Sequence, residues 1–534
     1  MAEKRSRIRR AIDTLLGREP KRGSMRMYGA ARGSRLTGGF GSGGDTSADA
    51  ELSSSLTRLR SASRQMVRDS SYAKRARTIV VNNVIGSGVG MQAQTMTTRG
   101  DLNKRVNADI EAAWCSWAVA DSCHTGGALH FHDLERAAMG QVFEAGEVFI
   151  RLHTARFGRS KIPLALELIE SERVPIEAQP IGTLEGVDVR MGIEHDEFGR
   201  AVAYWIRKRH PGDVRFAGVE TDRYERVPAD EVMHLRLVDR WPQTRGEPWL
   251  HTAVKKLNDM NEYSASEVQA ARMSSYLFGT IESKDEAGNL ATDEEDDGTQ
   301  VMDIQPGLVQ QLNPGEEFKL HNPNRPNVAL DPFLRYMLRE MAAGVGVSYE
   351  SLSRDYSQSN YSSSRLALLD DRDLWRMLQQ WWIRSFRAPL HSMWLMRAVL
   401  ARSIPSIAPS TYAPNQEAYE AVLWKPRGWS WIDPTKEVAA YKEGVKAGFI
   451  STSDVIALTA DGRDIEDVVT AMERDKQLFA EAGIEVDTDV AAERAAKAAP
   501  TAVAPKADPG DDDGEGDTAD ASPARVFSIG RTMQ

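Results

Sequence analysis

A glycine-rich stretch is the first part of the chain whose residue types could do chemistry. Gly86-Ser87-Gly88-Val89-Gly90 follows the apolar run TIVVNNVI, an order that also occurs in loops that cradle phosphate. A dinucleotide-binding loop needs its third glycine at the start of a helix, and an ATP-binding loop needs Lys followed by Ser or Thr. Here MQAQTMTTRG follows instead, so we expect a tight turn in preference to a nucleotide site.

Cysteine and histidine crowd into a second stretch, which could hold a metal ion. Within eighteen residues the chain has Cys115, Cys123, His124, His130 and His132. No CxxC pair and no HxxxH pair sets two of them at the usual spacing of a zinc site. We therefore expect packed or surface side chains and no bound metal.

The chain has two acidic groups, and the one on a predicted helix could bind a divalent cation, as a nuclease requires. Asp370, Asp371 and Asp373 lie in a helical pattern, where carboxylates commonly occupy the solvent-exposed face. Glu294, Glu295, Asp296 and Asp297 form a cluster that is typical of a solvated loop. Because no GxSxG, HExxH or SxxK motif stands between a strand and a helix, we expect no catalytic residue and no cofactor.

Length and composition indicate a large protein without a membrane span. The chain has 534 residues, 41% hydrophobic and 27% charged, so two or three packed units with flexible ends are expected. No apolar run is long enough to cross a bilayer, and the basic N-terminus lacks the apolar region of a secretory signal. With only two cysteines in this length, we expect a reducing compartment, the cytoplasm.

Charge is distributed unevenly along the chain. Residues 1–77 carry 18 Lys and Arg against 7 Asp and Glu, a net +11, so the remainder carries -21 of the total of -10. A basic arm on an acidic body is typical of proteins that meet nucleic acid or an acidic partner, and also of a solvated tail. The acidic body argues against tight binding of DNA over a wide surface, since Lys and Arg supply most nonspecific affinity.

Hydrophobic periodicity predicts the helices and strands on which these residues lie. Residues 20–50 are rich in Gly and Ser and predict an unfolded arm. Helices are predicted from Leu52 to Val81, from Asp101 to Trp117 and from Phe131 to Glu144, followed by a strand in GEVFIRLHTA. Two further strands are predicted, each with its apolar residues on one face. They are Val202, Tyr204 and Ile206 in the first strand, and Met233, Leu235 and Leu237 in the second. The fold class is therefore α+β.

Helices predominate in the second half of the chain. One is predicted over 247–278, and residues 282–331 interrupt it with the strand-like runs VMDIQPGLVQQL and EEFKLHNPN. The next helix begins with Asp331 as N-cap and ends near Gly344 or Gly346, with an apolar stripe of Phe333, Met337, Leu338, Met341 and Val345. A polar loop over 354–364 precedes a long helix with a bend allowed at Pro389 and a buried face of Leu374, Met377, Leu378, Trp381, Trp382 and Phe386.

Several stretches, taken in order, resemble the lambda-type family of tailed-phage portal proteins. They include NNVIGSGVGMQ, the pair Trp114 and Trp117, FEAGEVFIRL, LELIESERV, GIEHDEFGRAVAYWI, RVPADEVMHL, RGEPWLHTAV, LREMAAGVGVSYESLS, NYSSSR and PRGWSWIDPTKE. The resemblance covers about residues 50–475. Their number and order, more than any single motif, make it specific.

The resemblance implies a ring, usually of twelve copies, with wing, stem, clip and crown regions around a channel. It assigns 51–248 to the wing, 249–281 and 331–353 to two stem helices, 282–330 to the clip, 354–364 to a tunnel loop, 365–403 to a long wing helix and 404–495 to a helical crown. The basic arm 1–50 and the acidic Pro/Gly-rich tail 496–534 are expected to be disordered.

The resemblance also implies a DNA-facing site and a set of partners. The tunnel loop would present Tyr356, Ser357, Gln358, Ser359, Asn360 and Tyr361 to double-stranded DNA, flanked by Arg354 and Arg365. The clip would meet the terminase large subunit and later a head–tail adaptor, and the ring would contact the major capsid and scaffold proteins at the portal vertex of the virion. No membrane is involved.

Two other classes of protein stay open on the residues alone. A DNA-packaging enzyme, such as a terminase-like ATPase or nuclease, needs a P-loop or a metal–carboxylate site, and neither is legible. Another head–tail structural protein would normally be shorter and would not need two helices around an insertion.

Overall fold

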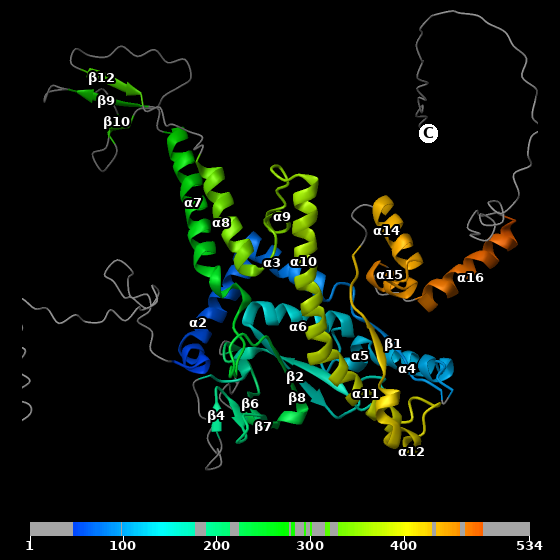
Figure 1. The fold of residues 1–534 in the computed structure, drawn as a ribbon. Helices are drawn as coiled ribbons and strands as arrows, with labels where there is room; N and C mark the ends of the chain where they lie inside the picture. The colour runs from blue at the N-terminus through cyan, green and yellow to red at the C-terminus, as the bar shows by residue number, and fades with distance from the viewer. Residues whose placement is uncertain are drawn as a thin grey trace, which may run out of the picture. The chain divides into compact units, whose positions relative to one another are not determined.

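The computed structural model describes residues 46–97, 99–176, 188–213, 224–276, 279–283, 293–294, 300–301, 316–320, 329–429, 434–459 and 465–483 (Figure 1). The chain divides into two compact units, residues 1–465 and 466–534, and each is treated by itself. Most of the predicted arm, most of the predicted clip and all of the predicted acidic tail lie outside the described residues. No helix within the described part of the chain is long and apolar enough to cross a membrane.

Two helices open the described chain where one helical stretch was predicted. Helix α2 (Ala48–Asp69) begins at Ser47, whose hydroxyl accepts a hydrogen bond from the backbone N–H of Ala50 at 3.1 Å. It ends at Ser70, which is extended, and α3 (Ser71–Val84) follows directly. The break was missed because buried residues continue on both sides of it, from Met66 to Ala73.

The glycine stretch is a turn that leads into a strand, as predicted. Gly86 and Gly88 have φ values of +60° and +126°, which side chains rarely adopt. A β-carbon on Gly88 would also lie 2.3 Å from the His132 ring. Strand β1 (Gly90–Ala93) follows the turn and pairs antiparallel with β13 (Val422–Lys425), a partner that sequence analysis did not find.

The next helices match their predicted positions. Helix α4 (Lys104–Trp117) is capped by the side chain of Asn103, a short α5 (Ala120–Cys123) follows, and α6 (Phe131–Ala145) ends at left-handed Gly146. Trp114 packs edge-on against Phe131 and Trp394, with ring centroids 5.1 and 4.9 Å away. The aromatic pair in α4 is therefore part of the core.

Two small antiparallel sheets confirm the α+β class. One has the strand order β3-β2-β8, from β2 (Glu147–His153), β3 (Ala165–Ile169) and β8 (Val232–Arg236). The other has the order β4-β5-β6-β7, from β4 (Asp188–Arg190), β5 (Ile193–His195), β6 (Ala201–Arg207) and β7 (Tyr224–Pro228). The 3-10 turns η2 (Ser171–Arg173) and η4 (Ala229–Glu231) flank them.

The apolar faces of two strands were predicted with different success. Met233 and Leu235 are buried, as predicted. In β6, Tyr204 and Ile206 are buried but Val202 is 43% exposed, so that prediction was wrong at one position. Trp205 lies on the opposite face of the strand and is also buried, so both faces of β6 are covered here. Its indole N–H donates to Glu194 at 2.8 Å.

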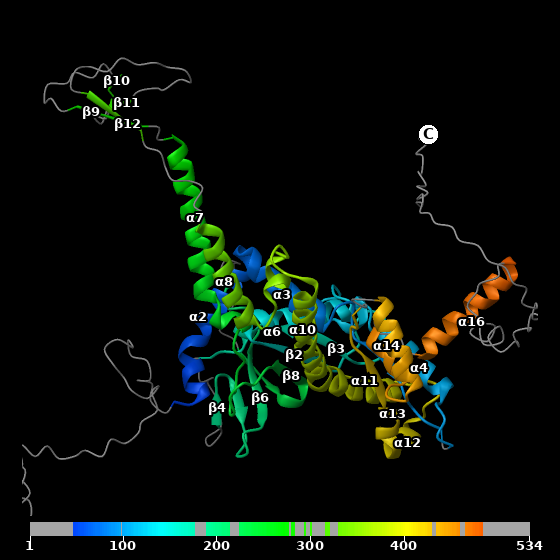
Figure 2. The same ribbon diagram turned by 45° about the horizontal axis from the view of Figure 1, so that its top comes forward.

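Two helices flank the segment that was predicted to interrupt the helical region (Figure 2). After the 3-10 turn η5 (Trp249–Thr252), α7 (Val254–Tyr276) packs against α8 (Leu330–Val345), with the rings of Tyr263 and Phe333 5.0 Å apart. Strand β9 (Gly279–Ser283) pairs with β12 (Glu316–Leu320), and β10 (Asp293–Glu294) with β11 (Gln300–Val301). The first predicted stem helix, 249–281, is therefore too long, since β9 begins at Gly279. Of the run VMDIQPGLVQQL, only Val301 lies within the described residues.

Helix α8 ends at the predicted glycine but begins earlier. The second predicted stem helix, 331–353, is therefore too long, since Tyr349–Ser353 is a separate helix. Ala329, and not Asp331, is the N-cap residue, and Asp331 lies in the first turn, where it accepts from Arg335 at 3.0 Å. Of the predicted apolar stripe, Leu338, Met341 and Val345 are buried and Met337 is partly buried against the core, whereas Phe333 is 43% exposed. Left-handed Gly346 ends the helix.

The long helix is interrupted by one wide turn. It comprises α10 (Tyr361–Trp382), a π-helical turn η6 (Ile383–Arg387) and α11 (Ala388–Leu400). Pro389 has no N–H to donate to residue 385, which explains the irregular turn just before it. Of the predicted buried face, Leu378, Trp382 and Phe386 are buried, and Leu374 and Trp381 are partly buried against the core. The prediction was wrong at Met377, which is 56% exposed, and Trp375 is buried instead.

Short elements complete the first unit. They are α12 (Pro409–Tyr412), η7 (Ala413–Asn415), α13 (Gln416–Tyr419), β13, α14 (Pro434–Lys446) and α15 (Thr452–Thr459). Helix α16 (Ile465–Ala482) supplies the described residues of the second unit. The predicted helical character of 404–495 holds apart from β13, and residues 484–495 lie outside the described residues.

Candidate nucleic-acid interface

The predicted DNA-facing loop is a short connection between two helices. Helix α9 (Tyr349–Ser353) ends at Arg354, which is left-handed with φ +59°. At the other end Asn360 caps α10, since its side chain accepts from the Ser363 N–H at 2.8 Å while the Ser363 hydroxyl accepts from the Asn360 N–H at 3.2 Å. The loop thus covers 354–360, and the predicted boundary at 364 was wrong because Tyr361 already begins the helix.

One carboxylate shapes this loop from within. Asp355 accepts hydrogen bonds from the Ser357 N–H and from the Tyr349 hydroxyl, both at 3.0 Å, and lies 3.6 Å from Nε of Arg335. The hydrogen bonds from Ser357, then that from Tyr349 and the charge of Arg335, lower the pKa of Asp355 to about 2. Asp355 is therefore ionised at neutral pH, and its charge is used to hold the loop.

The predicted loop residues lie together on an exposed edge. Tyr356 and Tyr361 are 59% and 56% exposed, and Gln358 accepts from Arg339 at 3.4 Å. The hydroxyl of Ser359 donates to the carbonyl of Tyr356 at 3.1 Å, and Ser357 is exposed. The structure therefore brings the six predicted positions into one surface of hydrogen-bonding groups.

The two predicted flanking arginines have different surroundings. Arg354 is exposed, and no ion pair with it occurs among the described residues. Arg365 lies in the first turns of α10, 3.7 Å from the carboxylate of Glu437 in α14. Only the first is therefore available to a partner without losing an internal ion pair.

Sequence reasoning missed two further arginines beside the loop. Arg75, from α3, donates its Nε to the carbonyl of Ser351 at 3.3 Å. Arg339, from α8, lies over the ring of Tyr349 at 5.3 Å and donates to Gln358. Arg75 and Ser351 are 276 positions apart, so no local pattern could have connected them.

A buried carboxylate fixes the helix that precedes the loop. Asp371 accepts from the N–H and the hydroxyl of Ser348, at 2.8 and 2.7 Å, and from the hydroxyl of Ser351 at 3.0 Å. Burial raises the pKa of Asp371, although these hydrogen bonds act in the opposite direction. Asp370 and Asp373 are exposed as predicted, but the prediction was wrong for Asp371, which points into the protein.

The other predicted chemical groups are spread over the molecule. Cys115 is exposed and Cys123 is buried, where burial raises the pKa of its thiol to about 12. Among the described residues, no three His, Cys, Asp or Glu side chains are placed to hold a metal ion. Glu294 belongs to β10, whereas Glu295, Asp296 and Asp297 lie outside the described residues.

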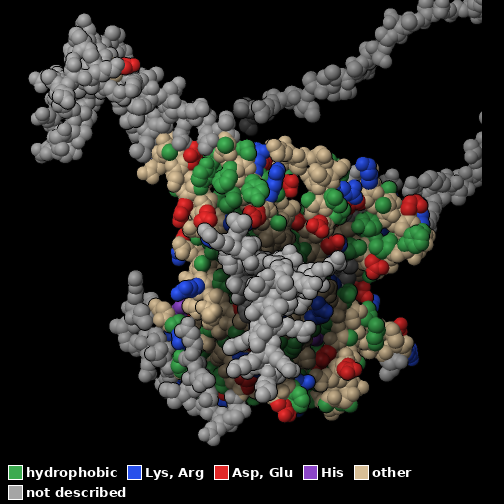
Figure 3. Space-filling model, turned by 60° about the vertical axis from the view of Figure 1, so that its left-hand side comes forward, with side chains coloured by type: hydrophobic (Ala, Val, Ile, Leu, Met, Phe, Trp, Pro, Cys, Tyr) green, Lys and Arg blue, Asp and Glu red, His purple; other side chains and the backbone are tan. Residues whose placement is uncertain are grey.

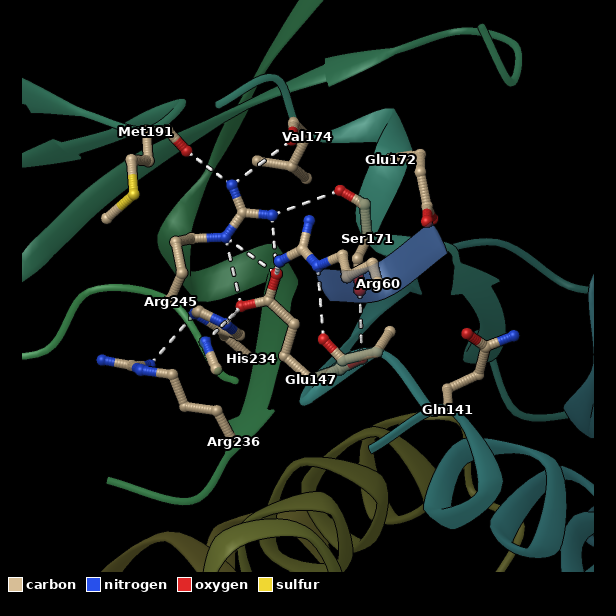
Figure 4. Close-up of polar contacts among 12 residues, drawn as sticks. Arg60, Gln141, Glu147, Ser171, Glu172, Val174, Met191, His234, Arg236 and Arg245 are labelled. Carbon is tan, nitrogen blue, oxygen red and sulfur yellow. Dashed lines mark hydrogen bonds and ion pairs between the residues drawn. The ribbon is translucent and has the colours of Figure 1, made fainter. Parts of the chain in front are cut away.

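A buried ion cluster, comprising Glu147, Arg60, Arg245 and His234, was not predicted (Figure 4). Glu147 lies at the start of β2 and pairs with Arg60 of α2 and with Arg245, whose Nε is 2.8 Å away. The N–H of Gly246 donates to the same carboxylate at 2.9 Å. Burial alone would raise the pKa of Glu147, but Arg245 and Arg60 outweigh it and hold the pKa well below its usual range.

His234 completes the cluster as a neutral side chain. Its Nε2 lies 2.9 Å from the Glu147 carboxylate, and its Nδ1 lies 3.0 Å from an N–H of Arg236. Nδ1 must then accept, which leaves the proton on Nε2. Burial lowers the pKa of His234 to about 3, and the charge of Arg236 acts in the same direction.

A second buried carboxylate joins the long helix to the core. Glu135 in α6 accepts from the indole N–H of Trp382 at 3.0 Å and lies 3.6 Å from the guanidinium of Arg387. That guanidinium also lies over the rings of Phe131 and Trp424, at 4.9 and 5.0 Å. The π-helical turn is therefore held between α6 and β13.

On the face shown in Figure 3, the described Lys and Arg side chains do not gather into one broad basic area. There, over the described residues, basic, acidic and hydrophobic side chains are interspersed. A wide basic surface is what nonspecific tight binding to duplex DNA requires. The described residues on this face do not form one.

Comparison with known proteins defines the class. Residues 34–379 match the family described as "Phage portal protein, lambda family". The chain belongs to this family, whose members are structural proteins.

Two individual relatives that are named as portal proteins are similar to this chain over most of its length. The "Probable portal protein" of Halomonas phage phiHAP-1 is 30% identical over 434 residues, which are 80% of this chain and 81% of the relative. "Portal protein B" of Escherichia phage lambda is 22% identical over 480 residues, 82% of this chain and 87% of the relative. A solved structure titled "Neck of empty GTA particle computed with C6 symmetry" aligns with a TM-score of 0.42 at 15% identity, over 76% of this chain and 93% of that one.

Proposed function

We propose that copies of this chain form a ring at one vertex of a phage capsid, and that double-stranded DNA passes through the ring during packaging and ejection. Membership of the portal family supports this function. The observation that carries it is the exposed loop 354–360, whose positions 356–360 bear no formal charge and which is held by Asp355 and Asn360. Weak contacts suit a conduit, because a wide cationic surface would bind DNA and impede its movement.

The regions of the portal fold are assigned by the same proposal. Helices α7 and α8 form the stem, the strands between them belong to the clip, and residues 51–248 with α10 and α11 form the wing. Residues 404–495 form the crown. The clip docks the terminase large subunit and later a head–tail adaptor, and the outer surface contacts capsid and scaffold proteins. The ring is a dodecamer that assembles in the host cytoplasm, and the chain has no enzymatic activity of its own.

Adding charge to the loop tests the channel role. We expect Gln358→Lys to leave ring assembly intact and to slow or stall DNA packaging, since each copy in the ring gains one phosphate-binding cation. The measurement is the rate of DNA filling of proheads that contain the variant ring. Packaging at the wild-type rate would contradict the loop assignment.

Asn360 needs a matched control, because it also caps α10. Asn360→Lys adds a charge and removes the cap, whereas Asn360→Ala removes the cap alone, at about 1 kcal/mol of stability. We expect packaging to be slower with Asn360→Lys than with Asn360→Ala. Equal rates for the two variants would show that the cap, and not the charge, is responsible.

A further inference from the structure

The arginines around the loop fall into two groups by their partners. Arg335 pairs with Asp331 at 3.0 Å and Arg365 with Glu437 at 3.7 Å. The other three are Arg75, Arg339 and Arg354, and no carboxylate within the described residues forms an ion pair with them. Three positive charges thus lie without an ion-pair partner next to a segment whose one acidic residue, Asp355, lies 3.6 Å from Nε of Arg335.

These three arginines come from three separate elements and meet at the loop. Arg75 approaches from α3 and binds the Ser351 carbonyl, Arg339 approaches from α8 and binds Gln358, and Arg354 is the first loop residue. The pKa of Arg75 is lowered by burial and then by the nearby charge of Arg354, so these two cations lie within electrostatic range of each other. An anion placed between like charges relieves their repulsion, which favours its binding.

The positions of these side chains are set before any ligand arrives. Stacking on Tyr349 holds the guanidinium of Arg339, and the Ser351 carbonyl holds that of Arg75. Both interactions leave N–H groups free to donate, since a guanidinium has five. Pre-organised guanidinium groups lose little side-chain freedom when they bind, so they suit brief contacts.

We propose that Arg75, Arg339 and Arg354 are the phosphate contacts of the loop, and that Arg335 and Arg365 are not. The inference rests on the proposed function and gives it a residue-level form. Duplex DNA fits the neighbouring groups, because Tyr, Ser and Gln side chains such as Tyr356, Ser357 and Gln358 commonly accompany Arg in contacts to the DNA backbone. Three cations in each copy, repeated around the ring, would give the duplex one narrow band of electrostatic contacts at the level of the loop.

Salt dependence of duplex binding by the assembled ring is the test. The probe is a short fluorescent DNA duplex, and its anisotropy gives the binding constant over a range of salt concentrations. Each phosphate contact adds about 0.9 to the slope of log K against log salt. We expect Arg354→Asn and Arg75→Gln each to reduce the slope by about 0.9 or more, and Arg365→Gln to leave it unchanged.

The variants are chosen so that folding does not decide the result. Arg354 is exposed and has left-handed φ +59°, a conformation that Asn tolerates. Native mass measurement confirms ring formation for each variant before binding is compared. Wild-type slopes in both Arg354→Asn and Arg75→Gln rings, or an equal loss with Arg365→Gln, would overturn the inference and leave the portal role intact. Failure of the wild-type chain to form rings would instead contradict the proposed function.

Discussion

The buried ion cluster and the loop 354–360 use the same residue type in opposite ways. In the cluster, Arg60 and Arg245 are buried and both bind Glu147, and the backbone around them satisfies further N–H groups. At the loop, Arg75 and Arg354 lie near the surface without a carboxylate partner among the described residues. A buried guanidinium must be neutralised within the protein, whereas an exposed one can remain available for a ligand.

This difference separates the part of the molecule that stabilises the fold from the part that is exposed to a partner. The cluster joins α2, β2, β8 and the segment before η5, so four stretches of sequence depend on one carboxylate. The loop depends on Asp355 and Asn360, whose contacts reach no farther than α8, α9 and the first turn of α10. Substitutions in the cluster should therefore lower the stability of the fold, and substitutions in the loop should change the rate of DNA packaging.

Removing the charge of Glu147 should have the largest effect on stability. Glu147→Gln leaves two buried guanidinium groups without a counter-charge, a change that costs about 3–5 kcal/mol. Urea or thermal unfolding followed by circular dichroism measures the loss. A variant as stable as the wild type would show that the cluster does not hold these elements together.

Replacing His234 should have a smaller effect that depends on pH. The folded protein keeps His234 neutral, with a pKa of about 3, while the unfolded chain titrates near 6.5, so the unfolded state binds more protons between these values. Stability is therefore complete above pH 6.5 and is lost as the pH falls toward 3, by about 2 kcal/mol at pH 5.

Gln can replace both hydrogen bonds of His234 without titrating. We expect His234→Gln to lose less stability than the wild type between pH 7 and pH 5, a range in which Glu147 stays ionised in both proteins. Unfolding temperatures at the two pH values make the comparison. An equal loss in both proteins would mean that His234 is not the group that titrates.

A surface ion pair should show the smallest effect. Arg151 and Glu225 are 2.8 Å apart, and the Glu225 side chain is 43% exposed. Solvent screens such a pair, so Glu225→Gln should change stability by less than about 1 kcal/mol in the same unfolding assay. A loss equal to that of Glu147→Gln would remove the distinction between buried and exposed pairs.

Local patterns in the sequence predicted much of the fold. Helices α4 and α6 have uninterrupted apolar periodicity, and their ends fall close to the predicted positions. The prediction allowed a bend at Pro389, and a π-helical turn lies just before it. The buried face of this helix was predicted apart from Met377 and Trp375, because both are apolar and only packing against the core decides between them.

Long-range contacts explain what local patterns could not predict. Strand β13 forms because β1, more than 300 positions earlier, offers a partner. Arg60 and Glu147 are 87 positions apart, and Gln379 and Asn83 are 296 apart. The loop residues could be named from the family resemblance, but Arg75 and Arg339 could not, since α3 and α8 meet the loop only in the folded chain.

Electron microscopy of the purified full-length chain, together with its native mass, tests the central claim most directly. The account predicts closed rings of a single copy number with an axial hole wide enough for duplex DNA. A population of monomers, or of open assemblies without a hole, would contradict it.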